Sequence, residues 1–128
     1  MTKQELGRLG EDAACGFLEQ HGFEIVERNY HSRYGEIDII AKDAKYLVFA
    51  EVKLRAVGSM VSGAEAVTAS KARKILKTAV VWMGLHPVQL QPRFDVIEIR
   101  TLSAGSGEIC GIDHIPSAFG MEACNELF

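Results

Sequence analysis

Two segments of alternating apolar residues, joined by a short polar connection, constrain this chain more than any other feature. Residues 35–41 and 46–55 flank the connection 42–45, whose composition favours a tight turn. One alternate set in these segments is entirely apolar: Ile37, Ile39, Ala41, Tyr46, Val48, Ala50, Val52 and Leu54. Because successive side chains of a strand point to opposite faces, the pattern predicts a β-hairpin with this whole face in the core.

The other face of the hairpin is apolar near the turn and charged away from it. With the turn at 42–45, the numbers of facing residues add up to 87, so Glu36 faces Glu51 and Asp38 is the diagonal neighbour of Glu51. Lys53 lies on the same face. Like charges opposite each other destabilise a sheet, and a bound cation would remove that cost. The alternative is a solvated strand end with Lys53 as an ion-pair partner.

The remainder of the chain predicts two helices and three more strands. We expect a helix over 3–21, a strand over 23–28, a polar connection over 29–34, a loop over 56–63, a helix over 64–83, strands over 93–100 and 109–115, and an irregular tail. Thr2 and Glu5 form a capping-box pattern at the start of the first helix. The order α-β-β-β-α-β-β predicts an α/β fold with a mixed central sheet flanked by helices. We expect a single domain over 1–128, with its core over about 3–100 and a C-terminal strand and tail over 101–128.

Composition limits the classes of protein to which the chain can belong. Hydrophobic residues make up 48% and charged residues 24%, as in a soluble globular protein. The longest weakly charged stretch, 75–85, is about half of what a bilayer span needs. The charged N-terminus lacks the apolar core of a secretion signal, and the three cysteines have no metal-binding spacing. We therefore predict a cytoplasmic protein without a membrane segment.

Charge is distributed unevenly along the chain. The net charge is −3, yet residues 28–77 hold ten Lys/Arg and five Asp/Glu, a net of +5, while the rest carries −8. A basic middle segment is compatible with a cationic surface that binds nucleic acid. Ordinary solvated lysines are the alternative.

Specific motifs resemble a known family. Gly35-Glu36-Ile37-Asp38-Ile39-Ile40, followed by Val48-Phe49-Ala50-Glu51-Val52-Lys53, is similar to the signature of PD-(D/E)XK nucleases. With Gly10-Glu11, Arg28-Asn29, Lys71 and Arg93-Phe94-Asp95 in order, the chain resembles the YraN family of bacterial proteins, predicted endonucleases related to archaeal Holliday junction resolvases. The proline of the motif is absent, with Glu36 or Ile37 near its place. The resemblance implies a restriction-endonuclease-like fold.

The resemblance also implies roles for individual residues. Asp38 and Glu51 would bind Mg²⁺ or Mn²⁺ together with the carbonyl of Val52, and Lys53 would orient or activate the attacking water. Glu11 would complete the acidic cluster from the first helix. Its place on the packing stripe of that helix is compatible with this role, although an edge-of-stripe glutamate can also point to water.

Several basic residues are candidates for binding phosphate. Lys71, on the second helix, either reaches the acidic cluster or extends into solvent. The predicted contacts to the nucleic-acid backbone are Arg33, Arg55, Arg73 and Lys74. Arg93 and Asp95 share a strand face, where they are interpreted as a structural ion pair.

Two functions from different classes follow from these patterns. The first is a metal-dependent nuclease, a DNA endonuclease acting on branched or otherwise structured DNA, which family analogy pairs with a homodimer. The second is a catalytically weak nucleic-acid-binding module in DNA processing. The set of two acids and a lysine favours the first, because a simple binding protein has no need to place carboxylates beside a phosphate.

Overall fold

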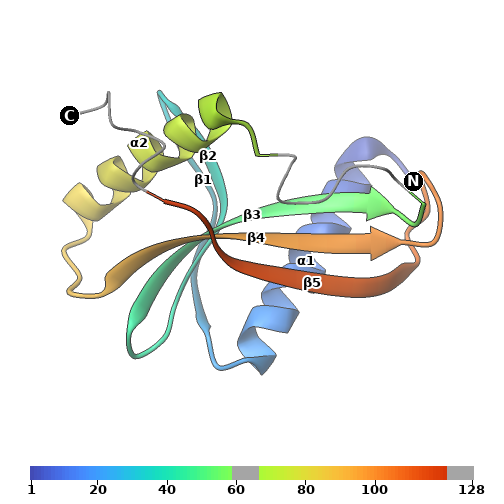
Figure 1. The fold of residues 1–128 in the computed structure, drawn as a ribbon, viewed down its shortest axis with the longest axis horizontal. Helices are drawn as coiled ribbons and strands as arrows, with labels where there is room; N and C mark the ends of the chain where they lie inside the picture. Colours follow the sequence, from blue (N-terminus) through green and yellow to red (C-terminus); the bar gives the residue numbers. More distant parts are fainter. Residues whose placement is uncertain (59–66, 121–128) are drawn as a thin grey trace.

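A five-stranded mixed sheet with one helix on each face forms the architecture of this protein (Figure 1). The computed structural model describes residues 1–58 and 67–120. Its elements are α1 (Lys3–Gln20), β1 (Glu24–Ser32), β2 (Gly35–Lys42), β3 (Tyr46–Ala56), α2 (Ala69–Leu85), β4 (Gln91–Thr101) and β5 (Ile109–Phe119). This order confirms the predicted α-β-β-β-α-β-β arrangement and the α/β class.

The strands lie side by side in the order β1-β2-β3-β4-β5. Only β3 and β4 run parallel to each other, and the other neighbours are antiparallel. The connection between β3 and β4 contains α2, as parallel neighbours require a long crossover. The hairpin of β2 and β3, which carries the acidic motif, therefore lies inside the sheet, while β1 and β5 form its edges.

Each face of the central hairpin packs against a different helix. On one face, Ile39 and Val48 pack with Leu18 of α1. On the other, Ile40 and Phe49 belong to the cluster of α2, which also contains Ile75, Leu76 and Trp82. The predicted alternation is thus confirmed along the middle of the hairpin. Two residues depart from it: Leu54 is 36% exposed, and Ile37 packs in the α2 cluster.

The predicted register of the hairpin is wrong by two residues. Ile39 pairs with Ala50 and Ile40 with Phe49, so that facing numbers add up to 89. The cause is Asp43, whose carboxylate accepts hydrogen bonds from the backbone N–H groups of Lys45 and Tyr46 at 2.9 and 2.6 Å. These bonds place the turn one residue later than predicted. A shift of two does not move side chains to the other face, so the paired residues 39–42 and 47–50 keep their predicted faces.

Element ends differ from the predictions mainly at the sheet edges and at α2. The strand predicted to end at residue 28 continues to Ser32, and the last strand extends four residues beyond the predicted end. The second helix begins at Ala69, where the Thr68 hydroxyl accepts the N–H of Lys71 as an N-cap. Of the predicted start over 64–68, residues 64–66 lie outside the described part. The capping box of Thr2 and Glu5 is confirmed, and no helix among the described residues is long and apolar enough to cross a membrane.

Candidate active site

The site lies where β2 and β3 separate. Their ladder ends at the pair Ile39–Ala50, and Asp38 and Glu51 are the next residues of the two strands. There the N–H of Val52 donates to Oδ2 of Asp38 at 2.8 Å. Asp38 is thus held in the gap between the strands. Glu36, which we expected opposite Glu51, instead contacts His31 on the exposed edge at 3.3 Å, so the prediction for Glu36 is wrong for the same reason as the register.

Burial and the nearby carboxylate of Glu51 make the ionisation of Asp38 costly. Burial and the charge of Glu51 raise the pKa of Asp38 to about 7, and the charge of Glu11 adds to the effect. The hydrogen bond from Val52 opposes the rise but does not cancel it. Asp38 is therefore a carboxyl group that a nearby positive charge would stabilise in its ionised form.

Two lysines neutralise Glu51, whose side chain is only 7% exposed. Lys71 of α2 reaches Oε1 of Glu51 at 2.5 Å, and Lys53 approaches the same oxygen at 3.2 Å. Burial, followed by the hydrogen bond with Lys71, lowers the pKa of Lys53. Burial alone would lower the pKa of Lys71, but the hydrogen bonds of Lys71 to Glu51 and Lys53 raise it above its usual value. The structure thus brings together four of the predicted residues: Asp38, Glu51, Lys53 and Lys71.

Glu11 lies at the border of this group. It projects from α1, which covers the opposite face of the hairpin, and its Oε1 is 3.8 Å from Arg28. No group of three His, Cys, Asp or Glu side chains that could hold a metal ion occurs among the residues that the structure describes. The predicted cluster of three acids is therefore not assembled, because Arg28 attracts Glu11 while the lysines hold Glu51.

The donor chemistry of the remaining pair nevertheless fits a hard divalent cation. Mg²⁺ binds through one or two carboxylates and keeps several waters, and Asp38 and Glu51 provide two carboxylates whose charges interact. Because burial and the charge of Glu51 raise the pKa of Asp38, a cation beside Asp38 would stabilise its ionised form. The residues that would hold the ion are Asp38, Glu51 and the carbonyl of Val52.

The predicted phosphate-binding residues separate into two groups. Arg33, in the turn between β1 and β2, lies over the Tyr34 ring with Lys77 of α2 on the same ring. Close by, Gly35 approaches Lys74, which lines a cavity of about 310 Å³ together with Lys71. We call the residues Arg33, Lys74 and Lys77 the α2 basic patch. Arg73, also on α2, is half-buried.

Arg55 has a different environment. Its guanidinium lies 2.9 Å from the buried Glu98 of β4. Glu98 was not predicted as the partner of Arg55, because the sequence does not show which residues of two parallel strands lie next to each other. Arg55 thus neutralises an internal charge, which argues against the predicted phosphate contact.

Arg93 and Asp95 form the predicted structural ion pair, with 2.8 Å between Nη2 and Oδ2. Asp95 is fully buried and also accepts from the backbone N–H of Ser117 at 3.0 Å and contacts Nε2 of His114 at 2.7 Å. Burial opposes its ionisation, but His114, Arg93 and the Ser117 N–H hold the pKa of Asp95 below its usual value. The group fastens β5 to β4 and lies away from the four gathered residues.

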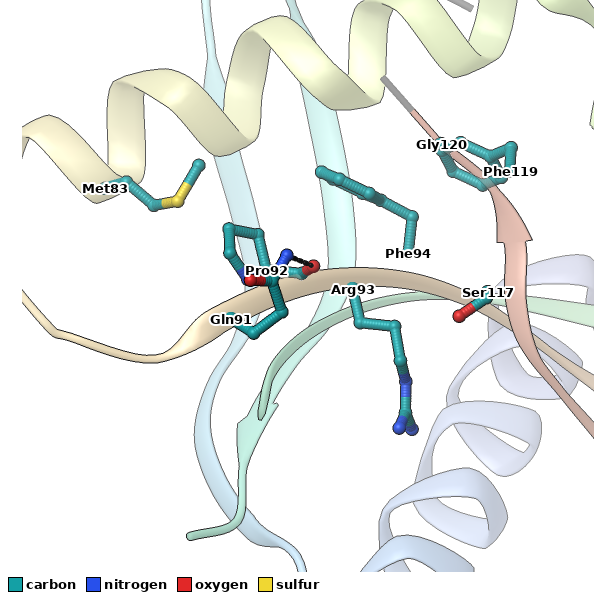
Figure 2. A pocket seen from close by; sticks show the side chains of 8 residues that line it. All are labelled: Met83, Gln91, Pro92, Arg93, Phe94, Ser117, Phe119 and Gly120. Atoms are coloured by element: carbon teal, nitrogen blue, oxygen red, sulfur yellow. Dashed lines mark hydrogen bonds between the residues drawn. The ribbon is translucent and has the colours of Figure 1, made fainter. Parts of the chain in front are cut away.

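A cavity of about 510 Å³ lies beside this group, and Figure 2 shows its lining. Met83 from α2 and the ring of Phe94 face it, whereas the Arg93 side chain leaves β4 on the opposite side. Phe94 and Phe119 stack with ring centres 5.5 Å apart. None of the four gathered residues lines this cavity, so we do not assign it to the site.

Fold and site together define a mixed α/β protein in which two carboxylates and two lysines meet where two central strands separate. Comparison with known proteins identifies the family. The chain belongs to the uncharacterised protein family UPF0102, whose model matches residues 10–99. This confirms the YraN-like family that the motifs predicted, whereas membership of the nuclease superfamily stays a prediction.

Full-length relatives support the assignment. A UPF0102 protein of Geobacter metallireducens is 44% identical over 93% of this chain and 95% of its own length. A UPF0102 protein of Syntrophotalea carbinolica is 41% identical over 95% of this chain and 98% of its own length. A UPF0102 protein of Desulforapulum autotrophicum is 51% identical over 76% of this chain and 81% of its own length. The chain therefore corresponds to nearly the whole length of two of these relatives, and all three bear only the family name.

Proposed function

We propose that this protein is a metal-dependent endonuclease that hydrolyses phosphodiester bonds in branched or otherwise structured DNA. One observation carries the proposal: Asp38 and Glu51 lie just beyond the end of the β2–β3 ladder, close enough for the charge of Glu51 to act on Asp38, with Lys53 and Lys71 on Glu51. The site pairs acids for a cation with ammonium groups for an anion. A phosphodiester and its metal ion need this combination of charges.

Asp38, Glu51 and the Val52 carbonyl are the proposed metal ligands. A bound Mg²⁺ or Mn²⁺ supplies charge neutralisation, polarisation of the phosphoryl oxygen and a lower pKa of bound water. Asp38 contributes a carboxylate held by the Val52 N–H, so its position is set before a ligand arrives. Glu11 acts through its charge on Asp38 rather than as a direct ligand.

The two lysines have different roles toward the substrate. Lys53 lies beside Glu51 and has a lowered pKa, so it exchanges a proton more readily than an exposed lysine and can orient or activate the attacking water. Lys71 keeps its charge, because its pKa is raised, and can donate a hydrogen bond to a non-bridging phosphate oxygen. The water oxygen bonds to phosphorus as the bond to the leaving oxygen breaks, the neutral form of Lys53 takes the proton of the water, and the leaving oxygen takes a proton from solvent.

The cellular setting follows from the same proposal. DNA is the preferred substrate over RNA and the preference for branches comes from family analogy. A branched junction offers two symmetric strands, which suits a homodimer. Such a substrate places the protein in the cytoplasm.

The direct test is cleavage of labelled DNA. Purified protein is incubated with single-stranded, duplex, flap and four-way DNA, and with RNA, with and without Mn²⁺. We expect metal-dependent cleavage of at least one DNA, lost by at least about a hundredfold in Asp38→Asn and Lys53→Met, since removal of one metal ligand or charge-stabilising group costs that much. Lys42→Met, a lysine of β2 paired with the exposed Glu24, is the matched control and keeps full activity.

A second function is favoured by one observation. Glu51 already has two lysine partners and no third acid joins it in the described part of the chain. A catalytically weak nucleic-acid-binding module would show this arrangement. Tight DNA binding with no cleavage of any substrate in Mg²⁺ or Mn²⁺ would favour that function over the endonuclease.

A further inference from the structure

A polar cavity of about 620 Å³ lies between the first half of α1 and β1. Gly7, Arg8 and Asp12 line it from the helix, and Arg28 and Asn29 line it from the strand. Arg28 connects the strand to the helix within this lining, because its Nη2 donates a hydrogen bond to Asp12 at 2.7 Å and lies 3.8 Å from Glu11. The volume is in the range of small-ligand sites.

Two of the residues that line the cavity link it to the candidate active site, although none of the four gathered residues lines it. Glu11 belongs to the lining, and the charge of Glu11 acts on Asp38. Asn29 lies between the pairs Arg28–Ile39 and Tyr30–Ile37, which places it opposite Asp38 across β1 and β2. A DNA strand whose scissile phosphate lies at the candidate active site would therefore extend its next nucleotide toward the cavity.

Asn29 has an uncommon backbone conformation for a strand. Its φ is +52°, in the left-handed region that side chains other than Gly, Asn and Asp rarely adopt. The conformation occurs within β1, at the residue opposite Asp38. Such outliers cluster at ligand-binding sites, where surrounding contacts maintain them.

The chemistry of the lining matches a nucleobase better than a phosphate. Two arginines and two carboxylates balance in charge, so an anion gains little from entering. The guanidinium groups donate hydrogen bonds, the Asp12 carboxylate accepts them, and the Asn29 and Gln4 amides do both. Arg, Asn and acidic side chains are the groups that pair with base edges, and guanidinium planes also stack on bases.

We propose that this cavity receives an unpaired nucleobase next to the scissile phosphate at the candidate active site. The inference rests on the proposed function and narrows its substrate class to DNA with unpaired nucleotides at the cleavage site. A base inside a duplex enters only at the cost of unstacking and unpairing. Flaps, loops and open junctions present such bases without the cost of unpairing.

Gly7 allows the cavity to be filled without loss of folding. A Cβ at Gly7 meets no atom within 4 Å, so the side chain of Gly7→Leu enters the cavity. Leu is a better helix former than Gly, and the melting temperature is expected not to fall. Gly16→Leu is the matched control, because Gly16 is on the same helix, also has open space and does not line the cavity.

The experiment compares two DNAs by fluorescence anisotropy in Ca²⁺. One is a duplex with a single-stranded flap, and the other is identical except that every flap nucleotide lacks its base. The native protein and Gly16→Leu should bind the first DNA about tenfold more tightly, the discrimination typical of one base contact. Gly7→Leu should bind both equally. Asn29→Gly, which keeps the positive φ and removes the amide, should reduce the preference as well.

Each outcome decides the proposal. If Gly7→Leu and Asn29→Gly keep the native preference, or if Gly7→Leu weakens both DNAs equally, the base-binding cavity is wrong. If the native protein shows no preference but cleaves both DNAs in Mn²⁺, only the cavity proposal fails. If it neither binds nor cleaves any DNA, the proposed function fails too.

Discussion

Asp38 combines two properties that seldom occur together in one carboxyl group: it is held by a backbone N–H, yet its pKa is raised. The first property fixes its position, and the second makes it costly to ionise without a cation. A protein that used Asp38 only to satisfy Val52 would gain from an uncharged amide there. The stability of the ligand-free protein at different pH values can reveal this cost.

We predict that Asp38→Asn stabilises the metal-free protein, increasingly so as pH rises from about 4 to 7. Below 3.8, Asp38 is protonated in both the folded and unfolded chains. Between 3.8 and about 7 the unfolded chain has lost this proton while the folded chain retains it, so native stability falls with pH across this window and is constant above it. The gain in unfolding free energy of the variant should reach about 2–4 kcal/mol, measured by urea titration in EDTA.

Asp43 provides the control of opposite sign. The N–H groups of Tyr46 and Lys45 lower the pKa of Asp43, so its contribution is present above the unfolded pKa and is lost as pH falls through the folded one. Asp43→Asn should therefore be less stable than the native protein at neutral pH, with the difference closing in acid. Parallel pH dependences for the two variants would contradict the assignment of the raised pKa to Asp38.

Single-residue patterning predicted much of the site. Asp38, Glu51 and Lys53 were placed on one face despite a register error of two, because strand alternation has a period of two. The separation of β2 from β3 could not be predicted, since it depends on Asn29 in β1 and on the bond from Val52 to Asp38. Glu11 and Arg28 come together through tertiary packing, which leaves no local signal.

Among the elements, the two edge strands were the least predictable. The last strand was predicted to end at residue 115, yet β5 continues through Pro116 to Phe119, because an edge strand can leave one N–H position unpaired. Polar residues in the second half of β1 hid that strand in the same way. The interior strands, enclosed by both helices, can be predicted from their apolar alternation. An edge strand has a neighbour on one side only, so other contacts must hold it to the sheet.

We predict that Asp95 attaches β5, and that Asp95→Asn lowers the unfolding free energy by about 3 kcal/mol at neutral pH, as expected for breaking a buried ion pair. The amide of the variant accepts weaker hydrogen bonds from Arg93, His114 and the Ser117 N–H than the charged carboxylate does. Because the pKa of Asp95 is lowered, the native advantage should vanish in acid. Urea titrations at several pH values measure both effects.

The matched control is Asp113→Asn on the same strand. Asp113 pairs with Arg100 but its side chain is 48% exposed, and exposed pairs contribute at most about 1 kcal/mol. Equal losses in the two variants would show that β5 is held by its apolar contacts, such as Phe119 on Phe94, and not by the buried carboxylate.

The whole molecule carries a net charge of −3, yet the α2 basic patch brings three positive side chains together. The turn between β1 and β2 packs on α2 through Ser32 and Thr78, whose hydroxyl oxygens are 2.9 Å apart. This contact brings Arg33 close to Lys74 and Lys77, although more than forty residues separate them in the chain. Lys74 lines the same cavity as Lys71, which connects the patch to the candidate active site.

We predict that the α2 basic patch binds the DNA backbone and makes the affinity strongly dependent on salt. Each neutralised phosphate contributes roughly 0.9 to the slope of log K against log salt, so the double variant Arg33→Ala with Lys74→Ala should reduce the slope by about 2. Anisotropy titrations of flap DNA at increasing NaCl measure it. The double variant Lys3→Ala with Lys42→Ala removes the same charge outside the patch and should leave the slope unchanged. If both pairs shift the affinity equally, the DNA responds to total charge and not to the patch, and the surface that guides the strand toward Asp38 must lie elsewhere.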